Sequence, residues 1–310
     1  MAAANSNIQI SELDFSTIKS NFINYLQSQD AFKDYNFDGS SMSVLLDVLA
    51  YNTQYNSYYL NMVANEMFLD SAIQRSSVIS QAKVLNYTTK SSIAPTAEVT
   101  VVFSNVTASS LTLPAYTPLL SSAINGINYN FLTFDSSTVN VINNTATFQN
   151  VKIKQGSIGN YSYIINSITN PSYTFEVPDP TIDTTTLQVV VQQSSTNTAV
   201  EVYNLSTNNL ELSGSSKVYF LQESLTGNYQ IYFGDGILGK KLSDGNIVLV
   251  SYISTEGTAS AGANSFQFMS SVGGYYPSQV ISVTPATTGG DKESIDSIKF
   301  QAPKSFAAQG

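Results

Sequence analysis

The chain of 310 residues contains no cysteine, no histidine and no tryptophan. Without cysteine and histidine it cannot build a Ser-His-Asp triad, a Cys-His pair or a zinc site of the Cys/His type. Histidine is also the usual general base near neutral pH, so any acid–base chemistry would fall to carboxylates, lysine or tyrosine. These absences favour a binding or structural protein over an enzyme.

Charge is scarce as well. Charged residues make up 11% of the chain, against about 25% in a typical soluble domain, and hydrophobic residues make up 42%. The net charge of −9 argues against a nucleic-acid-binding surface. Residues 1–70 carry −6 of it, with eight acidic residues against Lys19 and Lys33, which fits either a basic partner or a solvated helical surface.

Long apolar runs are also missing. No run reaches the roughly 18 residues of a membrane span, and the start of the chain shows no secretory signal, so we expect no membrane partner. What the chain does contain is uncharged polar residues together with 19 Tyr and 16 Phe, which suit β-structure and broad contact surfaces. Its length allows two domains with separate cores.

Capping residues and helical spacing predict three N-terminal helices. Ser11 or Asp14 caps the first, which runs to about residue 29. Ser40 or Ser41 opens a long second helix that ends near residue 69, and a third covers about 72–85. Helical hairpins with one wet, aromatic-rich side often contact helices of a partner chain.

The second helix carries a dense tyrosine cluster, made up of Tyr51, Tyr55, Tyr58 and Tyr59. The four rings spread over more than one helical face, and a small hairpin cannot bury all of them. We therefore expect part of this cluster to contact another chain. The residues that we predict for this partner interface are Phe22, Tyr25, Leu26, Leu45, Leu49, Tyr55 and Tyr59.

From residue 98 the pattern changes to short apolar runs separated by turn residues, at about the 8–12-residue spacing of sandwiches and barrels. The expected strand runs are 99–103, 111–113, 129–134, 139–148, 151–154, 161–165, 187–191, 218–221, 229–233 and 247–253. From Gly257 the chain is glycine-rich, which predicts loop structure. Residues 291–306 are predicted to form a short polar helix that is broken at Pro303.

These patterns predict an α+β fold, in which an N-terminal helical hairpin or bundle segment precedes a mostly antiparallel β-rich domain. The expected divisions are a helical assembly region over 1–90, a β-rich arm domain over 91–285, and a linker with the start of a truncated C-terminal region over 286–310.

One segment matches a phosphate-binding fingerprint. Gly234, Gly236 and Gly239 satisfy G-x-G-x-x-G, and Glu256 follows at about the distance that a dinucleotide fold requires. Such fingerprints need a helix after the glycines, whereas here a turn and a strand at 247–253 follow. We therefore interpret Gly234, Asp235, Gly236 and Gly239 as a fold-determining turn and expect no cofactor.

Asp235 and Asp244 invite two further interpretations, a glycosidase pair or, with Glu256, a calcium site. Asp-Gly is, however, the usual composition of tight hairpin turns, and both aspartates precede glycine. We expect no catalytic residue, no metal site and no small-molecule substrate.

Several segments, in their order, resemble the baseplate wedge proteins of T-even-type contractile-tailed phages, in the broader baseplate J family. These segments are 37–40, 46–53, 65–72, 75–78, 82–87, 113–117, 232–239, 247–252, 255–257, 289–295 and 302–303. The resemblance covers nearly the whole chain. In such relatives a further large region follows the Ala302-Pro303 segment and helps to join wedges around a ring.

The resemblance implies a structural, non-enzymatic subunit of the viral tail baseplate. Its N-terminal helices would join a bundle with a second copy of itself and with other wedge proteins, without nucleic acid or membrane. It would be assembled in the host cytoplasm, would reside in the virion, and would take part in the conformational switch that precedes sheath contraction. A receptor-binding or tail-fibre-like adhesin is the alternative from a different class.

Overall fold

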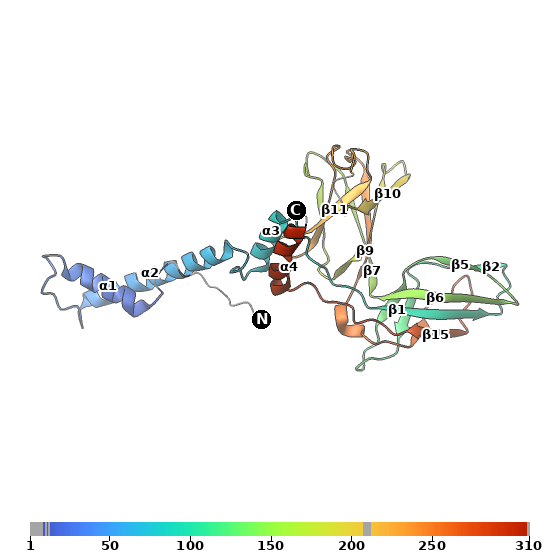
Figure 1. Cartoon of the computed structure of the whole chain (residues 1–310), viewed down its shortest axis with the longest axis horizontal. Coiled ribbons are helices and arrows are strands. Elements are labelled where there is room, and N and C mark those ends of the chain that lie inside the picture. Colours follow the sequence, from blue (N-terminus) through green and yellow to red (C-terminus); the bar gives the residue numbers. More distant parts are fainter. Residues whose placement is uncertain (1–8, 10, 12, 207–211, 309–310) are drawn as a thin grey trace. The chain divides into compact units, whose positions relative to one another are not determined.

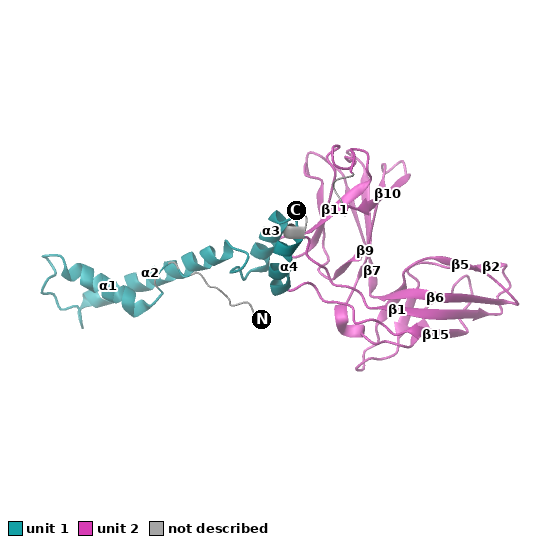
Figure 2. Cartoon of the chain, viewed as in Figure 1, with its two compact units in different colours: residues 1–87, 295–310 teal, residues 88–294 magenta. Residues whose placement is uncertain are grey.

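The computed structural model describes residues 9, 11, 13–206 and 212–308. The chain divides into two compact units, coloured separately in Figure 2. Unit 1 combines residues 1–87 with 295–310, and unit 2 comprises 88–294. Unit 2 is therefore inserted between two segments of a helical unit.

Unit 1 contains the four α-helices of the described residues: α1 (Phe15–Gln27), α2 (Ser41–Glu66), α3 (Arg75–Val84) and α4 (Ile295–Ala308) (Figure 1). The Asp14 carboxylate accepts a hydrogen bond from the Thr17 amide at 2.6 Å and caps α1. The Ser40 hydroxyl caps α2 by accepting from the amide of Ser43 at 3.4 Å. Both capping predictions are confirmed, because side-chain oxygens at these positions satisfy amides that have no partner within the helix.

Helices α3 and α4 share a small apolar core, to which Val78, Ala82, Ile298 and Ala302 contribute buried side chains. The prediction that the last helix breaks at Pro303 is wrong, since α4 continues through it to Ala308. Proline removes one helical hydrogen bond. Here the preceding turn is held against α3 by Ile298 and Ala302, while Pro303 itself is exposed.

Unit 2 contains a six-stranded sheet with the order β14-β3-β4-β6-β1-β15. Its strands are β1 (Thr96–Ser104), β3 (Pro118–Ser121), β4 (Asn130–Thr133), β6 (Thr145–Gln155), β14 (Phe266–Phe268) and β15 (Gln279–Thr284). Its core contains Phe103, Phe131 and Phe148, all almost fully buried. A separate two-stranded ladder joins β2 (Ser110–Leu113) to β5 (Ser137–Asn140).

The second sheet of unit 2 has seven strands in the order β7-β13-β9-β10-β11-β12-β8. They are β7 (Ser157–Ile164), β8 (Thr174–Val177), β9 (Ile182–Gln192), β10 (Val200–Leu205), β11 (Val218–Glu223), β12 (Tyr229–Phe233) and β13 (Ile247–Ser254). The Tyr163 hydroxyl on β7 donates to the Glu176 carbonyl on β8, so the two edges meet and the sheet curls toward a barrel. A core separate from that of the six-stranded sheet fills it, with Tyr229 and Ile231 completely buried.

The predicted fold class is confirmed, since all strand pairs that the structure describes are antiparallel except β10 with β11. Two strand predictions need correction. The run 139–148 is divided between β5 and β6 by a turn at Asn143 and Asn144, both with positive φ. The region after Gly257 is not only loop, because a short 3-10 helix (Gly257–Ser260) and strands β14 and β15 form there.

Candidate assembly interface

Helix α2 presents large apolar side chains to solvent over most of its circumference. Leu45 and Leu49 are 58% and 53% exposed, and Tyr55 and Tyr59 are exposed as well. Helices that are apolar on all sides are normally buried. The same surface in contact with water therefore makes α2 a candidate contact surface.

Within the described residues, α1 covers one face of α2 in antiparallel orientation (Figure 1), and Ser11 contacts the same helix through Ser57 and Asn61. The Lys19 ammonium on α1 lies 2.6 Å from the Asp47 carboxylate, and the Gln54 side chain donates to the Leu13 carbonyl at 2.9 Å. Leu46 and Ala50 are buried on this face. The interface residues predicted on α1 differ in exposure: Tyr25 is exposed, whereas Phe22 and Leu26 are half-buried.

The exposed surface is larger than the predicted set. Further exposed apolar residues on α2, which the sequence prediction did not include in the interface, are Val44, Val48, Tyr51, Tyr58, Leu60 and Val63. The signal that could have identified them is the absence of a polar face: between Ser41 and Glu66 the only charged residues are Asp47 and Glu66 itself. A solvated helix of this length normally carries charges along one side.

Tyrosine rings form a ladder along α2. The rings of Tyr51 and Tyr55 stack with centroids 6.3 Å apart, and Tyr55 and Tyr59 meet edge to face at 4.7 Å. The hydroxyls of Tyr55 and Tyr59 lie 2.7 Å apart, and this hydrogen bond with Tyr55, together with the neighbouring phenols, raises the pKa of Tyr59. The side chains of Leu13, Tyr51, Gln54, Tyr55 and Tyr58 line a groove of about 230 Å³. The ladder offers flat rings and neutral hydroxyls, the chemistry of a protein contact surface.

The Gly234–Gly239 segment is a turn after β12, and no helix follows it in the described residues before β13 begins. The Asp235 carboxylate accepts hydrogen bonds from the amides of Ile237 and Leu238 at 2.8 and 3.0 Å. Gly236 and Gly239 have positive φ, and a Cβ on Gly234 would lie 2.3 Å from the backbone of Gly239. This geometry lacks the helix N-terminus that would hold phosphate in a nucleotide-binding fold.

The two candidate acids also serve turns. Asp244 accepts from the amide and hydroxyl of Ser167 at 2.7 and 2.8 Å. Amide hydrogen bonds from Ile237 and Leu238 lower the pKa of Asp235, and the contacts with Ser167 lower that of Asp244. A general acid needs a raised pKa, so these carboxylates are unsuited to that role. The described residues contain no group of three or more His, Cys, Asp or Glu side chains that could hold a metal ion.

A helical unit with an exposed apolar surface, joined along the chain to a β-rich unit with two cores, is the architecture of a structural protein. Residues 14–87 match a family model described as "Baseplate wedge protein gp6-like, helical domain". Across 92% of its length the chain is 28% identical to "Baseplate wedge protein gp6" of Enterobacteria phage T4. The predicted resemblance to baseplate wedge proteins is therefore confirmed.

The chain spans 46% of the length of that relative. Among solved structures it is similar to a chain of the "anti-feeding prophage (AFP) baseplate", with 12% identity and a TM-score of 0.34 over 97% of this chain and 61% of the other. No helix in the described part of this chain combines the length and the hydropathy that a bilayer crossing requires.

Proposed function

We propose that this chain is a structural subunit of a phage tail baseplate wedge. The observation that carries the proposal is the exposed apolar surface of α2, which lies within the segment that matches the gp6-like helical domain. The 28% identity to a T4 wedge protein supports the same role. The subunit would reside in the virion baseplate, be assembled in the host cytoplasm, and change its contacts when the baseplate switches before sheath contraction.

The partners that we propose are a second copy of this chain and other wedge proteins, which would lay helices against α2. Exposed Leu and Val side chains before and after the tyrosines, such as Leu49 and Leu60, supply the apolar anchors that helix-in-groove contacts use. Full burial of an exposed leucine contributes about 1.5–3 kcal/mol, and because Leu45 and Leu49 are 58% and 53% exposed, covering both would contribute about 2–3 kcal/mol, roughly a quarter to a third of a micromolar affinity.

We further propose that the subunit performs no catalysis and takes no cofactor, small-molecule substrate, nucleic acid or membrane as a partner. The absence of cysteine and histidine and the net charge of −9 support this part of the proposal. So does the engagement of Asp235 and Asp244 in turns.

The test is a double variant, Leu45→Asp with Leu49→Asp, co-expressed with the neighbouring wedge proteins of the same phage. Both side chains are more than half exposed, so the variant should fold as the wild type does. Burying two carboxylates in an apolar contact costs several kcal/mol, so co-purification and particle assembly should fall by at least about a hundredfold.

A matched control places the same charges elsewhere. Ile168 and Ile237 are also exposed apolar residues, but they lie in loops of unit 2, and the double variant Ile168→Asp with Ile237→Asp should assemble normally. Normal assembly of the α2 variant, or equal loss with the control, would contradict the proposed interface.

A further inference from the structure

The two sheets of unit 2 meet at a joint through which the chain passes without a loop. Strand β6 of the six-stranded sheet ends at Gln155 and strand β7 of the seven-stranded sheet begins at Ser157, with only Gly156 between them. Each sheet has a core of its own. Burial within either core leaves the angle between the sheets undetermined, so that angle must depend on contacts at the joint.

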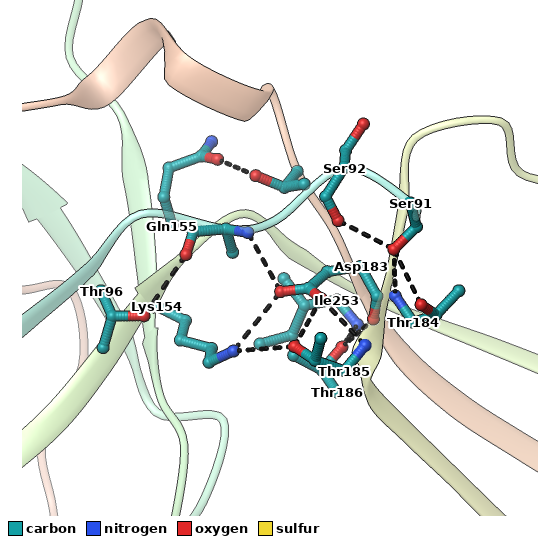
Figure 3. A network of polar contacts seen from close by, with 12 residues as sticks. Ser91, Ser92, Thr96, Lys154, Gln155, Asp183, Thr184, Thr185, Thr186 and Ile253 are labelled. Atoms are coloured by element: carbon teal, nitrogen blue, oxygen red, sulfur yellow. Dashed lines mark hydrogen bonds and ion pairs between the residues drawn. The ribbon is translucent and has the colours of Figure 1, made fainter. Parts of the chain in front are cut away.

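Asp183, near the start of β9, lies at the centre of the joint and is completely buried (Figure 3). One carboxylate oxygen accepts from the amide and hydroxyl of Thr185 at 3.0 and 2.6 Å, on its own strand. The other accepts from the Ala94 amide at 3.0 Å, in the segment that leads into β1, and lies 3.4 Å from the Lys154 ammonium on β6. The side chain is thus satisfied by groups from both sheets.

This arrangement makes rotation at the joint costly. If the sheets turned apart, the oxygen that faces Ala94 and Lys154 would lose its partners while remaining in a buried site. Buried carboxylates are tolerated only when they are paired and hydrogen-bonded, so partial loss of these partners is strongly unfavourable. The Lys154 side chain is itself only 14% exposed and lies over the Phe134 ring, which gives it little freedom to follow a moving partner.

A second polar tie crosses the joint independently of Asp183. The side-chain oxygen of Gln155, at the end of β6, accepts from the Thr255 hydroxyl at 2.6 Å and from the Glu256 amide at 3.0 Å, just after β13. Gln155 is 1% exposed and Thr255 is 3% exposed. The chain is therefore anchored to the second sheet two residues before β7 begins.

Shape and apolar contact complete the joint. A Cβ on Gly156 would lie 2.2 Å from the Ser254 carbonyl oxygen, and its φ of 135° is accessible to glycine rather than to other residues. A small apolar cluster also spans the sheets, with Leu132 from β4 and Ile253 from β13 packed around Ala94. Backbone approach, apolar packing and two polar ties all act at one place.

We propose that Asp183 locks this joint, so that the two sheets of unit 2 move as one body rather than as two hinged domains. The inference concerns unit 2 itself and does not depend on the proposed baseplate role. It assigns to Asp183, Lys154 and Gln155 the part of setting the angle between the sheets, while neither sheet needs them for its own core.

The absence of cysteine allows a direct test with spin labels. Thr147→Cys on β6 and Ser195→Cys in the β9–β10 hairpin are exposed positions on different sheets. In the full chain their distance distribution should be a single narrow peak. With Asp183→Asn, which keeps the volume but replaces one acceptor oxygen by a donor amide, the distribution should broaden about twofold or split.

Three controls make the result decisive. Asp244→Asn removes an exposed carboxylate that is hydrogen-bonded to Ser167 in the seven-stranded sheet's loops, and it should leave the distribution narrow. A label pair at Ile168→Cys and Ser195→Cys, in two loops that connect strands of the seven-stranded sheet, should stay narrow in Asp183→Asn and thereby exclude general unfolding. If Asp183→Asn does not fold, Lys154→Met removes the crossing ammonium and should also broaden the first pair.

A broad distribution in the otherwise unchanged chain would overturn the proposal, because it would show a hinge. The proposal is equally overturned if every folded variant of Asp183 and Lys154 keeps a distribution as narrow as that of the parent chain. Assembly with wedge partners is not measured in this experiment, so its outcome is separate from that of the Leu45 and Leu49 test.

Discussion

Truncation to alanine should lower the stability of unit 1 at one of two adjacent leucines of α2 and leave it nearly unchanged at the other. Leu46 is 3% exposed and faces α1, whereas Leu45 is 58% exposed. Leucine and alanine have similar helix propensities, so Leu→Ala at either position changes side-chain contacts and little else. For Leu46→Ala we expect a loss of about 2–3 kcal/mol, near the low end for buried leucine because a two-helix contact can partly collapse into the space. For Leu45→Ala we expect a change within about 0.5 kcal/mol.

The assay is urea unfolding followed by the helical circular dichroism signal, which reports on unit 1 because all four described α-helices belong to it. With a slope of about 1 kcal/mol per molar urea, Leu46→Ala should lower the urea midpoint by about 2–3 M, and Leu45→Ala should change it by about 0.5 M or less. A dilution series separates folding from pairing between copies, since only pairing depends on concentration. Equal losses at the two positions would refute the assignment of the two faces of α2.

Two further substitutions test local contacts. The Glu66 carboxylate accepts hydrogen bonds from the Ile73 amide at 2.9 Å and from the Gln74 amide at 3.2 Å. Burial alone would raise the pKa of Glu66, but these hydrogen bonds, a further one from Ser77 and the nearby charge of Lys299 lower it below the ordinary value of 4.5. The stability that Glu66 contributes is therefore present above pH 4.5 and is lost as the pH falls through its lowered pKa. In Glu66→Gln the urea midpoint of unit 1 should therefore fall less steeply at acid pH than in the parent chain. An unchanged pH dependence of the midpoint would contradict this role of Glu66. Gly234→Ala should destabilise unit 2 by about 1–3 kcal/mol in thermal unfolding, because its Cβ would lie 2.3 Å from Gly239. In Gly290→Ala the nearest atom is 3.6 Å away and the change should be small; equal effects would show that the Gly234–Gly239 turn does not determine the fold.

The helices could be predicted because their signals are local. Asp14 and Ser40 cap α1 and α2 as expected, since the hydroxyl or carboxylate and the amide that it satisfies are three residues apart. The covered face of α2 could not be predicted in the same way. Apolar residues surround this helix, so the period points to no single face, and only the position of α1 selects Leu46 and Ala50 for burial.

Long-range pairing explains why two strands and one buried contact of unit 2 could not be predicted from the sequence. Strands β14 and β15 are short or half exposed, and β15 exists because it pairs with β1 from the far end of the unit. The sequence pattern around Asp183 indicated a linker between β-segments and could not predict its contacts, since its partners Lys154 and Ala94 lie 29 and 89 residues away along the chain. The turn at Gly234–Gly239 could be predicted from local sequence alone. Its G-x-G-x-x-G match suggested phosphate binding, but the strand that follows excluded the helix that such a site requires.

The apolar contacts on α2 and the buried hydrogen bonds around Asp183 should respond differently to a conformational change. Apolar contacts such as those offered by Leu45 and Leu49 are non-directional, so a partner helix can shift along α2 at small cost. The hydrogen bonds around Asp183 are directional and buried, so they permit one geometry or none. If assembly does not depend on the angle between the sheets, the Asp183→Asn variant should show a broader label distance distribution and still co-purify with wedge partners. The Leu45 and Leu49 variant should lose those partners while its spin-label distribution stays narrow.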